Sequence, residues 1–184
     1  ADKITTVSPT YALEITEEIA GGGMHGLLQT RKAQGRLHGV LNGVDDTVWN
    51  PETDTNIVAT YKPSYMQGKS KNKAELQQMF HLPEDKDAML MVMVTRLTEQ
   101  KGADFILDRI DELMEERVQL VVLGSGSPPL EYLLNEARSR YPEQIGVYIG
   151  YNEVLSHQII AGGDVILVPS RFEPCGLTQL YGLK

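Results

Sequence analysis

The fold can be inferred outward from residues 164–182, which read DVILVPSRFEPCGLTQLYG. The first part, Asp164 to Val168, is a short apolar run that predicts a buried β-strand. A turn punctuated by proline and glycine follows, and then the expected start of a helix. A helix N-terminus presents free backbone N–H groups that can bind phosphate. The position just beyond the carboxyl end of a strand is also where open α/β sheets bind their ligands.

Three more apolar runs lie upstream, at residues 89–94, 118–123 and 145–149. Segments with apolar residues at helical spacing separate them from one another and from the run at 164–168. Strands without polar alternation, each followed by a helix, are typical of a parallel sheet covered on both faces. From about residue 86 onward, the sequence therefore predicts an α/β, Rossmann-like, doubly wound parallel sheet.

The pattern before residue 86 is weaker. Residues 3–7 predict a short strand, and Ser8-Pro9-Thr10 predicts a helix entry with proline in its first turn. The three glycines at 21–23 end whatever element precedes them. Residues 40–45 predict a strand ending in an Asn-Gly turn, and residues 50–72 a surface loop that leads into a helix at about 72–80.

Composition limits the function. Of the 184 residues, 41% are hydrophobic, enough for a core, and no apolar run approaches the ~20 residues of a membrane span. The formal net charge of −8 argues against broad binding to nucleic acid or anionic membranes. The single cysteine excludes an intramolecular disulfide and suits a reducing cytoplasm. Because the chain begins at Ala1 without a secretory signal, we expect it to be excised from a longer protein.

Two cations follow the strand expected at residues 89–94. Arg96 and Lys101 lie on one strand-to-helix loop, so both can reach an anion at the edge of the sheet. Taken alone, such residues are more often merely solvated. Their occurrence together with the acidic loop around Glu173 favours a shared anion site. A guanidinium suits two-pronged contact with phosphate, and an ammonium acts as a compact point charge.

Two other strand ends carry candidate ligand contacts. The glycine pair of residues 124–126 is either a plain tight turn or a contact with a ligand, and the pattern alone does not decide. Tyr151, at another strand end, is by its residue type alone best read as an ordinary packed aromatic. Because parallel strands end at one edge of a sheet, we expect these positions to share a rim with Arg96 and Glu173.

Metal and thiol chemistry find no support in the sequence. The four histidines are scattered, and no HxH or HExxH spacing predicts a metal site. A nucleophilic Cys175 would need a nearby activating histidine, and neither His157 nor any other is placed by the sequence to serve. We therefore expect no metal, no cofactor and no thiol enzyme, and phosphate charge would be met by Arg96, Lys101 and a helix N-terminus.

Residues 169–182 resemble the signature loop of the bacterial glycogen synthases and plant starch synthases. Residues 1–12 resemble the last strand and helix of the acceptor-side domain of those enzymes, and residues 40–51 resemble the crossover into their nucleotide-binding domain. The resemblance runs from end to end and is weakest in residues 17–36 and 52–85. It implies a GT-B fold, in which two Rossmann domains flank the active site.

On this mapping, residues 1–37 are the end of the N-terminal acceptor-side domain. Residues 38–184 are part of the C-terminal nucleotide-sugar-binding domain. Most of the first domain would then lie outside this chain.

The resemblance also implies roles for the candidate residues. Arg96 and Lys101 match the pair that grips the pyrophosphate of the sugar nucleotide. Glu173 matches an acidic residue that hydrogen-bonds the donor sugar, and Tyr151 a tyrosine against the adenine ring. Four further positions belong to the nucleotide-sugar site, the last three through backbone N–H groups and a hydroxyl that face the diphosphate: Cys175, Gly176, Leu177 and Thr178.

The chain departs from related proteins at two positions. Tyr181 stands where other retaining transferases often carry a second glutamate, a substitution that fits the bacterial and plant synthases. Ser127 stands where the family often has an acidic residue. We assign Ser127 no role, and the thiol of Cys175 no chemical task.

The resemblance implies transfer of glucose from ADP-glucose to the non-reducing end of an α-1,4-glucan (glycogen), with retention of configuration, by a cytoplasmic bacterial enzyme. Two alternatives remain open: another retaining nucleotide-sugar glycosyltransferase of the same fold, and a noncatalytic nucleotide-binding module. With most of the acceptor-side domain absent, we expect the isolated piece to be inactive. We also expect it to self-associate through exposed sheet edges, and to bind neither nucleic acid nor membrane.

Overall fold

The computed structural model describes residues 1–184, which form two compact units. The first unit holds residues 1–44 together with 173–177, and the second holds residues 45–172 together with 178–184. No helix in the chain combines the length and apolar character that crossing a membrane requires.

The first unit is a small α/β layer. Strand β1 (Ile4–Thr6) pairs in parallel with β2 (Leu37–Gly39), and helices α1 (Pro9–Glu14) and α2 (His25–Ala33) connect them. The expected strand at 3–7 is confirmed by β1, and the glycine break at 21–23 falls in the turn between the helices. The core of this layer consists of Ala12, Leu28 and Leu37, with Ile4 and Ile15 packed against them.

Helix α1 begins as its sequence predicts. The Ser8 hydroxyl accepts a hydrogen bond from the backbone N–H of Tyr11 at 3.0 Å, which satisfies one of the unpaired donors of the first turn. Pro9 occupies the first turn, where its missing N–H costs nothing.

The prediction of a strand at residues 40–45 is wrong. The strand of this region is β2, at Leu37–Gly39, and the Val40 N–H makes one last bond to the Thr6 carbonyl at 2.8 Å. Beyond Thr6 the segment paired with β2 turns into α1. The apolar pair Val40 and Leu41 therefore has no strand to join. Both side chains are exposed. The first turn comes instead at Asp45, whose carboxylate accepts from two following backbone N–H groups.

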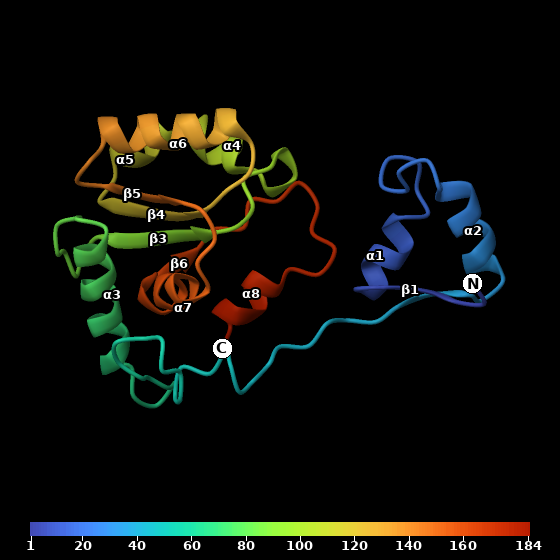
Figure 1. The fold of residues 1–184 in the computed structure, drawn as a ribbon, viewed down its shortest axis with the longest axis horizontal. Helices are drawn as coiled ribbons and strands as arrows, with labels where there is room; N and C mark the ends of the chain where they lie inside the picture. Colours follow the sequence, from blue (N-terminus) through green and yellow to red (C-terminus); the bar gives the residue numbers. More distant parts are fainter. The chain divides into compact units, whose positions relative to one another are not determined.

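The second unit is built on a sheet of four parallel strands (Figure 1). Their spatial order is β5 (Ile145–Ile149), β4 (Val118–Gly124), β3 (Met89–Val94) and β6 (Val165–Ile166). Every adjacent pair is parallel, which confirms the doubly wound assignment. Each connection passes through at least one helix, as the alternating pattern predicted.

Helices cover both faces of this sheet (Figure 1). One layer holds α4 (Ala103–Leu107), α5 (Ile110–Met114) and α6 (Pro128–Arg140), and the other holds α3 (Gln67–Met79) and α7 (Glu153–Gly162). Strand β4 is buried along its whole length. Its alternate side chains divide between the two cores: Leu120 and Val122 belong to the first, Val121 and Leu123 to the second.

Three boundaries differ from the predicted ones. The helical pattern after β3 is split into α4 and α5 at Asp108 and Arg109. Helix α3 starts at Gln67 rather than near residue 72, because its polar first turns carry no apolar period. Strand β6 covers only Val165 and Ile166, although single backbone bonds to β3 continue on either side of it.

An ion pair between a buried lysine, Lys73, and a partly exposed aspartate, Asp164, ties α3 to the sheet. Lys73 is 8% exposed, and its ammonium lies 2.7 Å from an Asp164 carboxylate oxygen. It also donates to the backbone carbonyls of Lys86 at 3.0 Å and Ala88 at 2.6 Å. The same Asp164 oxygen accepts from the Leu90 N–H at 2.9 Å. One helix and two strands therefore meet at this pair, and all three donor protons of the ammonium have acceptors.

Candidate functional site

A cavity of about 310 Å³ opens at the carboxyl ends of β3, β4 and β5, within the second unit. That volume is at the lower end of the range for small-molecule sites. Parallel strands bring the loops that follow them to one edge, so residues far apart in sequence meet here. The lining comprises Trp49, Val94, Thr95, Arg96, Leu123, Gly124, Ser125, Gly150, Tyr151, Asn152, Glu153, Ser156, Ile160, Thr178 and Tyr181.

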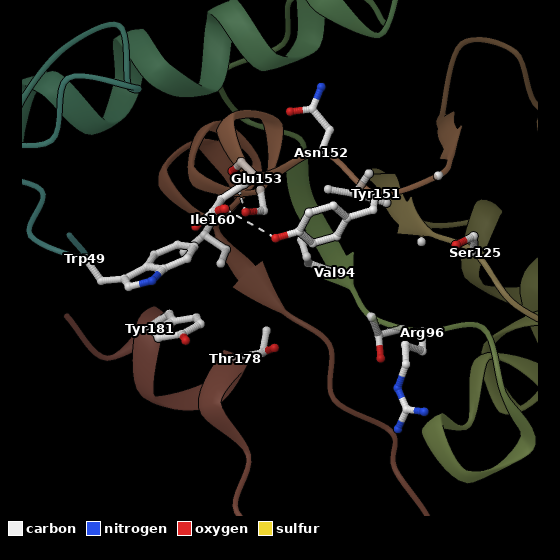
Figure 2. Close-up of a pocket in the computed structure, with 15 residues that line it drawn as sticks. Trp49, Val94, Arg96, Ser125, Tyr151, Asn152, Glu153, Ile160, Thr178 and Tyr181 are labelled. Atoms are coloured by element: carbon white, nitrogen blue, oxygen red, sulfur yellow. Dashed lines mark hydrogen bonds between the residues drawn. The ribbon is translucent and has the colours of Figure 1, made fainter. Parts of the chain in front are cut away.

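Arg96 lies two residues after the end of β3, and its side chain lines the cavity (Figure 2). Its side chain is exposed, and it brings a positive charge to a chain that is negative overall. The second predicted cation, Lys101, lies on the same loop in the short 3-10 turn η1 (Glu99–Lys101), outside the cavity lining. The structure therefore brings Arg96, but not Lys101, into this cavity.

The glycines of residues 124–126 let two loops pack backbone against backbone. A Cβ on Gly124 would lie 2.0 Å from the Thr95 carbonyl oxygen, and one on Gly126 would lie 2.3 Å from that of Leu97. The Leu97 N–H donates to the Ser125 carbonyl at 2.9 Å. The tight approach explains both glycines, while Gly124 and Ser125 also line the cavity. The two readings that the sequence left open are thus compatible.

Tyr151 is a surface residue, because 84% of it is exposed. Its ring stands at the cavity, and its hydroxyl donates to a Glu153 carboxylate oxygen at 3.3 Å (Figure 2). The Glu153 charge raises the pKa of the Tyr151 phenol above its usual value. An exposed aromatic face held at a strand end suits stacking of a planar base.

The sequence analysis missed a stack of three rings, two of which, Trp49 and Tyr181, line the cavity. Trp49 lies between His157 and Tyr181, with ring centroids 3.7 Å and 3.9 Å apart and nearly parallel planes. His157 is buried, and its Nδ1 lies 2.6 Å from a carboxylate oxygen of Asp54, which is also buried. In the sequence, Tyr181 was noted as a substitution for glutamate and His157 as a histidine without a catalytic place, but neither was linked to Trp49. The stack joins segments more than 100 residues apart, so no local pattern signals it.

Helix α8 (Leu177–Gly182) supplies Thr178 and Tyr181 to the cavity (Figure 2). The other predicted residues of the signature loop fall in the first unit: Glu173, Cys175, Gly176 and Leu177. Gly176 has a φ of 81°, a conformation that favours glycine directly before the helix. The roles of these four residues stay predictions.

The thiol of Cys175 offers a first test of those roles. Cys175 is a free, partly buried cysteine. Because we assign the thiol no chemical task, Cys175→Ser should lower kcat by less than about tenfold, or 1.4 kcal/mol. Steady-state kinetics of the full-length protein measure this. Complete inactivation of a variant with an unchanged melting temperature would show that the sulfur takes part in the reaction.

Comparison with known proteins places this site in a family. Residues 88–183 match the sequence model of the family described as "Glycosyl transferases group 1", and residues 1–30 match the one described as "Starch synthase catalytic domain". The first match covers more than half of the chain, and the chain belongs to the group 1 glycosyltransferases.

Individual relatives narrow the comparison. The chain is 98% identical over its whole length to a glycogen synthase of Actinobacillus pleuropneumoniae, and 78% identical to one of Glaesserella parasuis. It covers 38% and 39% of those relatives. Its structure matches the catalytic domain of starch synthase IV from Arabidopsis thaliana, bound to ADP and acarbose, with a TM-score of 0.91 and 35% identity over 100% of this chain and 38% of that one. The resemblance to glycogen and starch synthases and the GT-B, Rossmann-like fold are confirmed.

Proposed function

We propose that the protein containing this chain transfers glucose from ADP-glucose to the non-reducing end of an α-1,4-glucan, with retention of configuration. The observation that carries the proposal is the strand-end cavity, where an exposed aromatic face at Tyr151 and a cation at Arg96 meet. The glycogen synthase relatives and the ADP-bound starch synthase neighbour support it. A cytoplasmic, bacterial setting is part of the same proposal.

The chemistry requires stabilisation of charge on the leaving diphosphate while an oxocarbenium-like glucosyl centre forms. Arg96 and Lys101 stabilise that leaving-group charge. Glu173 orients the glucosyl hydroxyls. The phosphates also receive hydrogen bonds from the Thr178 hydroxyl and from backbone N–H groups at Gly176 and Leu177, and Cys175 belongs to the same loop.

We further propose that the chain joins two domains. Residues 1–37 end the acceptor-side domain, and residues 38–184 form part of the nucleotide-sugar-binding domain. Support comes from the separate family matches of residues 1–30 and 88–183. In such an arrangement the glucan acceptor binds chiefly to parts outside this chain.

A chimera tests the proposed reaction. This chain would replace the 98% identical segment of the A. pleuropneumoniae glycogen synthase, and the product would be incubated with glycogen and labelled ADP-glucose or UDP-glucose. We expect incorporation from ADP-glucose that a Glu173→Ala control abolishes. Preference for another sugar nucleotide would favour a different transferase of this fold. Nucleotide binding without any transfer would favour a noncatalytic module.

The role of Tyr151 gives a second prediction, measured in the same chimera. Tyr151→Ala should weaken ADP binding by about 1–3 kcal/mol, the usual loss when an aromatic platform under a base is removed. Tyr151→Phe should bind nearly as well, because the stacking face remains. Calorimetric titration with ADP measures both.

Tyr132 on α6 provides a matched control, since it is 69% exposed and lies outside the cavity lining. Tyr132→Ala should leave ADP binding unchanged. Equal affinities for Tyr151→Ala and Tyr132→Ala would contradict the stacking role.

A further inference from the structure

The signature loop carries a cation, Arg171, to which the proposed reaction gives no task. It lies two residues before Glu173. Its charge and its position in the sequence alone would suggest a third cation on the diphosphate, beside Arg96 and Lys101. In the structure, however, its guanidinium is bound by protein groups. It makes a two-pronged pair with Asp104, at 2.9 Å and 2.6 Å, and also donates to the Glu99 backbone carbonyl.

An aromatic ring closes the other side of this pair. The guanidinium carbon of Arg171 lies 4.2 Å from the ring centroid of Phe105. The hydrogen bonds from Arg171 hold the pKa of the Asp104 carboxyl below its usual value, so the carboxylate is charged throughout the neutral range. Bidentate pairing combined with ring stacking fixes an arginine in both position and orientation, which a lysine cannot reproduce.

The backbones of the same two segments also interlock. The Arg171 N–H donates to the Gln100 carbonyl at 2.9 Å, and the Gln100 side-chain amide donates to the Phe172 carbonyl at 3.3 Å. Gly102, with a φ of 71°, approaches the Pro169 carbonyl so closely that a Cβ would lie 2.1 Å from that oxygen. We name this set of contacts, between residues 99–105 and 169–172, the loop clamp.

Strand order explains why the loop clamp forms. Strand β6 pairs directly with β3, so the loop after β6 runs beside the loop after β3 at the carboxyl edge. The β3 loop contains η1, whose last residue is Lys101, one of the two predicted leaving-group cations. The β6 loop ends at Phe172, and Glu173 is the next residue. The loop clamp therefore fixes the segment that carries Lys101, and in the sequence it ends one residue before Glu173.

We propose that Arg171 is a positioning residue that, through Asp104, holds the Lys101 turn in the geometry that the departing diphosphate requires. It acts on the reaction through the turn and not by touching the nucleotide sugar. This inference rests on the proposed function, because the turn matters only if a sugar nucleotide binds beside it. Small misplacements of a charged group lower rates strongly, so the clamp should affect turnover more than folding.

Asp104 separates this proposal from direct phosphate binding. If Arg171 acts through Asp104, then Asp104→Asn, Arg171→Gln and the double variant should each lower kcat/KM for ADP-glucose by tenfold or more. The double variant should be no worse than Arg171→Gln alone, because removing Arg171 already breaks its pair with Asp104. The loss should fall on the donor, leaving the KM for glycogen unchanged. Kinetics of the active chimera measure this.

The surface pair of Arg109 and Glu112 is the matched control. It joins an arginine to a carboxylate at 2.7 Å at the start of α5, and both side chains are at least 70% exposed. Glu112→Gln should leave kcat/KM unchanged. Arg171→Lys keeps the charge but not the two-pronged geometry, so it should lose activity at an unchanged melting temperature. If Arg171→Gln fails to fold, the kinetics of Arg171→Lys test the proposal instead.

Three results would overturn the proposal. Normal kcat/KM in Asp104→Asn alongside loss in Arg171→Gln would show that Arg171 binds the diphosphate itself. Full activity of Arg171→Lys would show that only its charge matters. Full activity of every clamp variant would show that the clamp holds nothing the reaction needs. An inactive unmutated chimera would instead count against the proposed function.

Discussion

Lys101→Ala in the full-length chimera is expected to lower kcat about a hundred- to thousandfold, a loss of ~2.7–4 kcal/mol of transition-state stabilisation. The ammonium acts mainly on charge that grows on the diphosphate as the glucosyl bond breaks. An interaction that strengthens in the transition state contributes to kcat more than to ground-state binding. The KM for glycogen should therefore change little. Steady-state kinetics with varied ADP-glucose and glycogen separate the two effects.

A second lysine controls for loss of charge alone. Lys71 is exposed on α3 and lies outside the cavity lining, so Lys71→Ala should retain the kcat of the unmutated chimera. Melting temperatures of both variants show whether a loss of activity reflects unfolding. An unchanged kcat in a folded Lys101→Ala variant would refute the leaving-group role.

The strands were predictable because of where they lie. β3 and β4 are covered on both faces, and such strands read as continuous apolar runs that need no alternation to be recognised. The segment at residues 40–45 shows the limit of that inference. Val40 and Leu41 look like part of a strand, but a strand needs a neighbouring strand with which to pair. The strand beside β2 is β1, and the backbone turns away from it after Thr6. Pairing is a long-range property that a local run does not encode.

The site residues at strand ends were predictable from the sequence, but those placed by long-range contacts were not. Parallel topology places the residues after each strand on one edge, and Arg96, Gly124 and Tyr151 do line one cavity. Thr178 joins them from α8. Trp49 was missed as a wall residue because its place depends on stacking against His157 and Tyr181, far along the chain. Their ligand roles remain predictions.

The largest effect on stability is expected at the pair that joins α3 to the sheet. Asp164→Ala should lower the free energy of opening this region by about 3 kcal/mol, as when one partner of a buried ion pair is removed. That value lies at the lower end of the usual range because the Asp164 side chain is 36% exposed. The change leaves the ammonium of Lys73, a residue that is 8% exposed, without its counter-charge. It also removes the acceptor of the Leu90 N–H.

Graded variants locate the cause of this loss. Asp164→Asn keeps an oxygen that can accept from Leu90 and should cost less than Asp164→Ala, while Glu112→Ala, at the exposed pair on α5, should change stability by no more than ~0.5 kcal/mol. Native-state hydrogen exchange of the α3 and β3 amides measures the opening free energy where the pair acts. If α3 exchanges equally in Asp164→Ala and Glu112→Ala, the ion pair does not hold the helix on the sheet. Packing of Leu76 against the apolar core, where it is 1% exposed, would then account for that attachment alone.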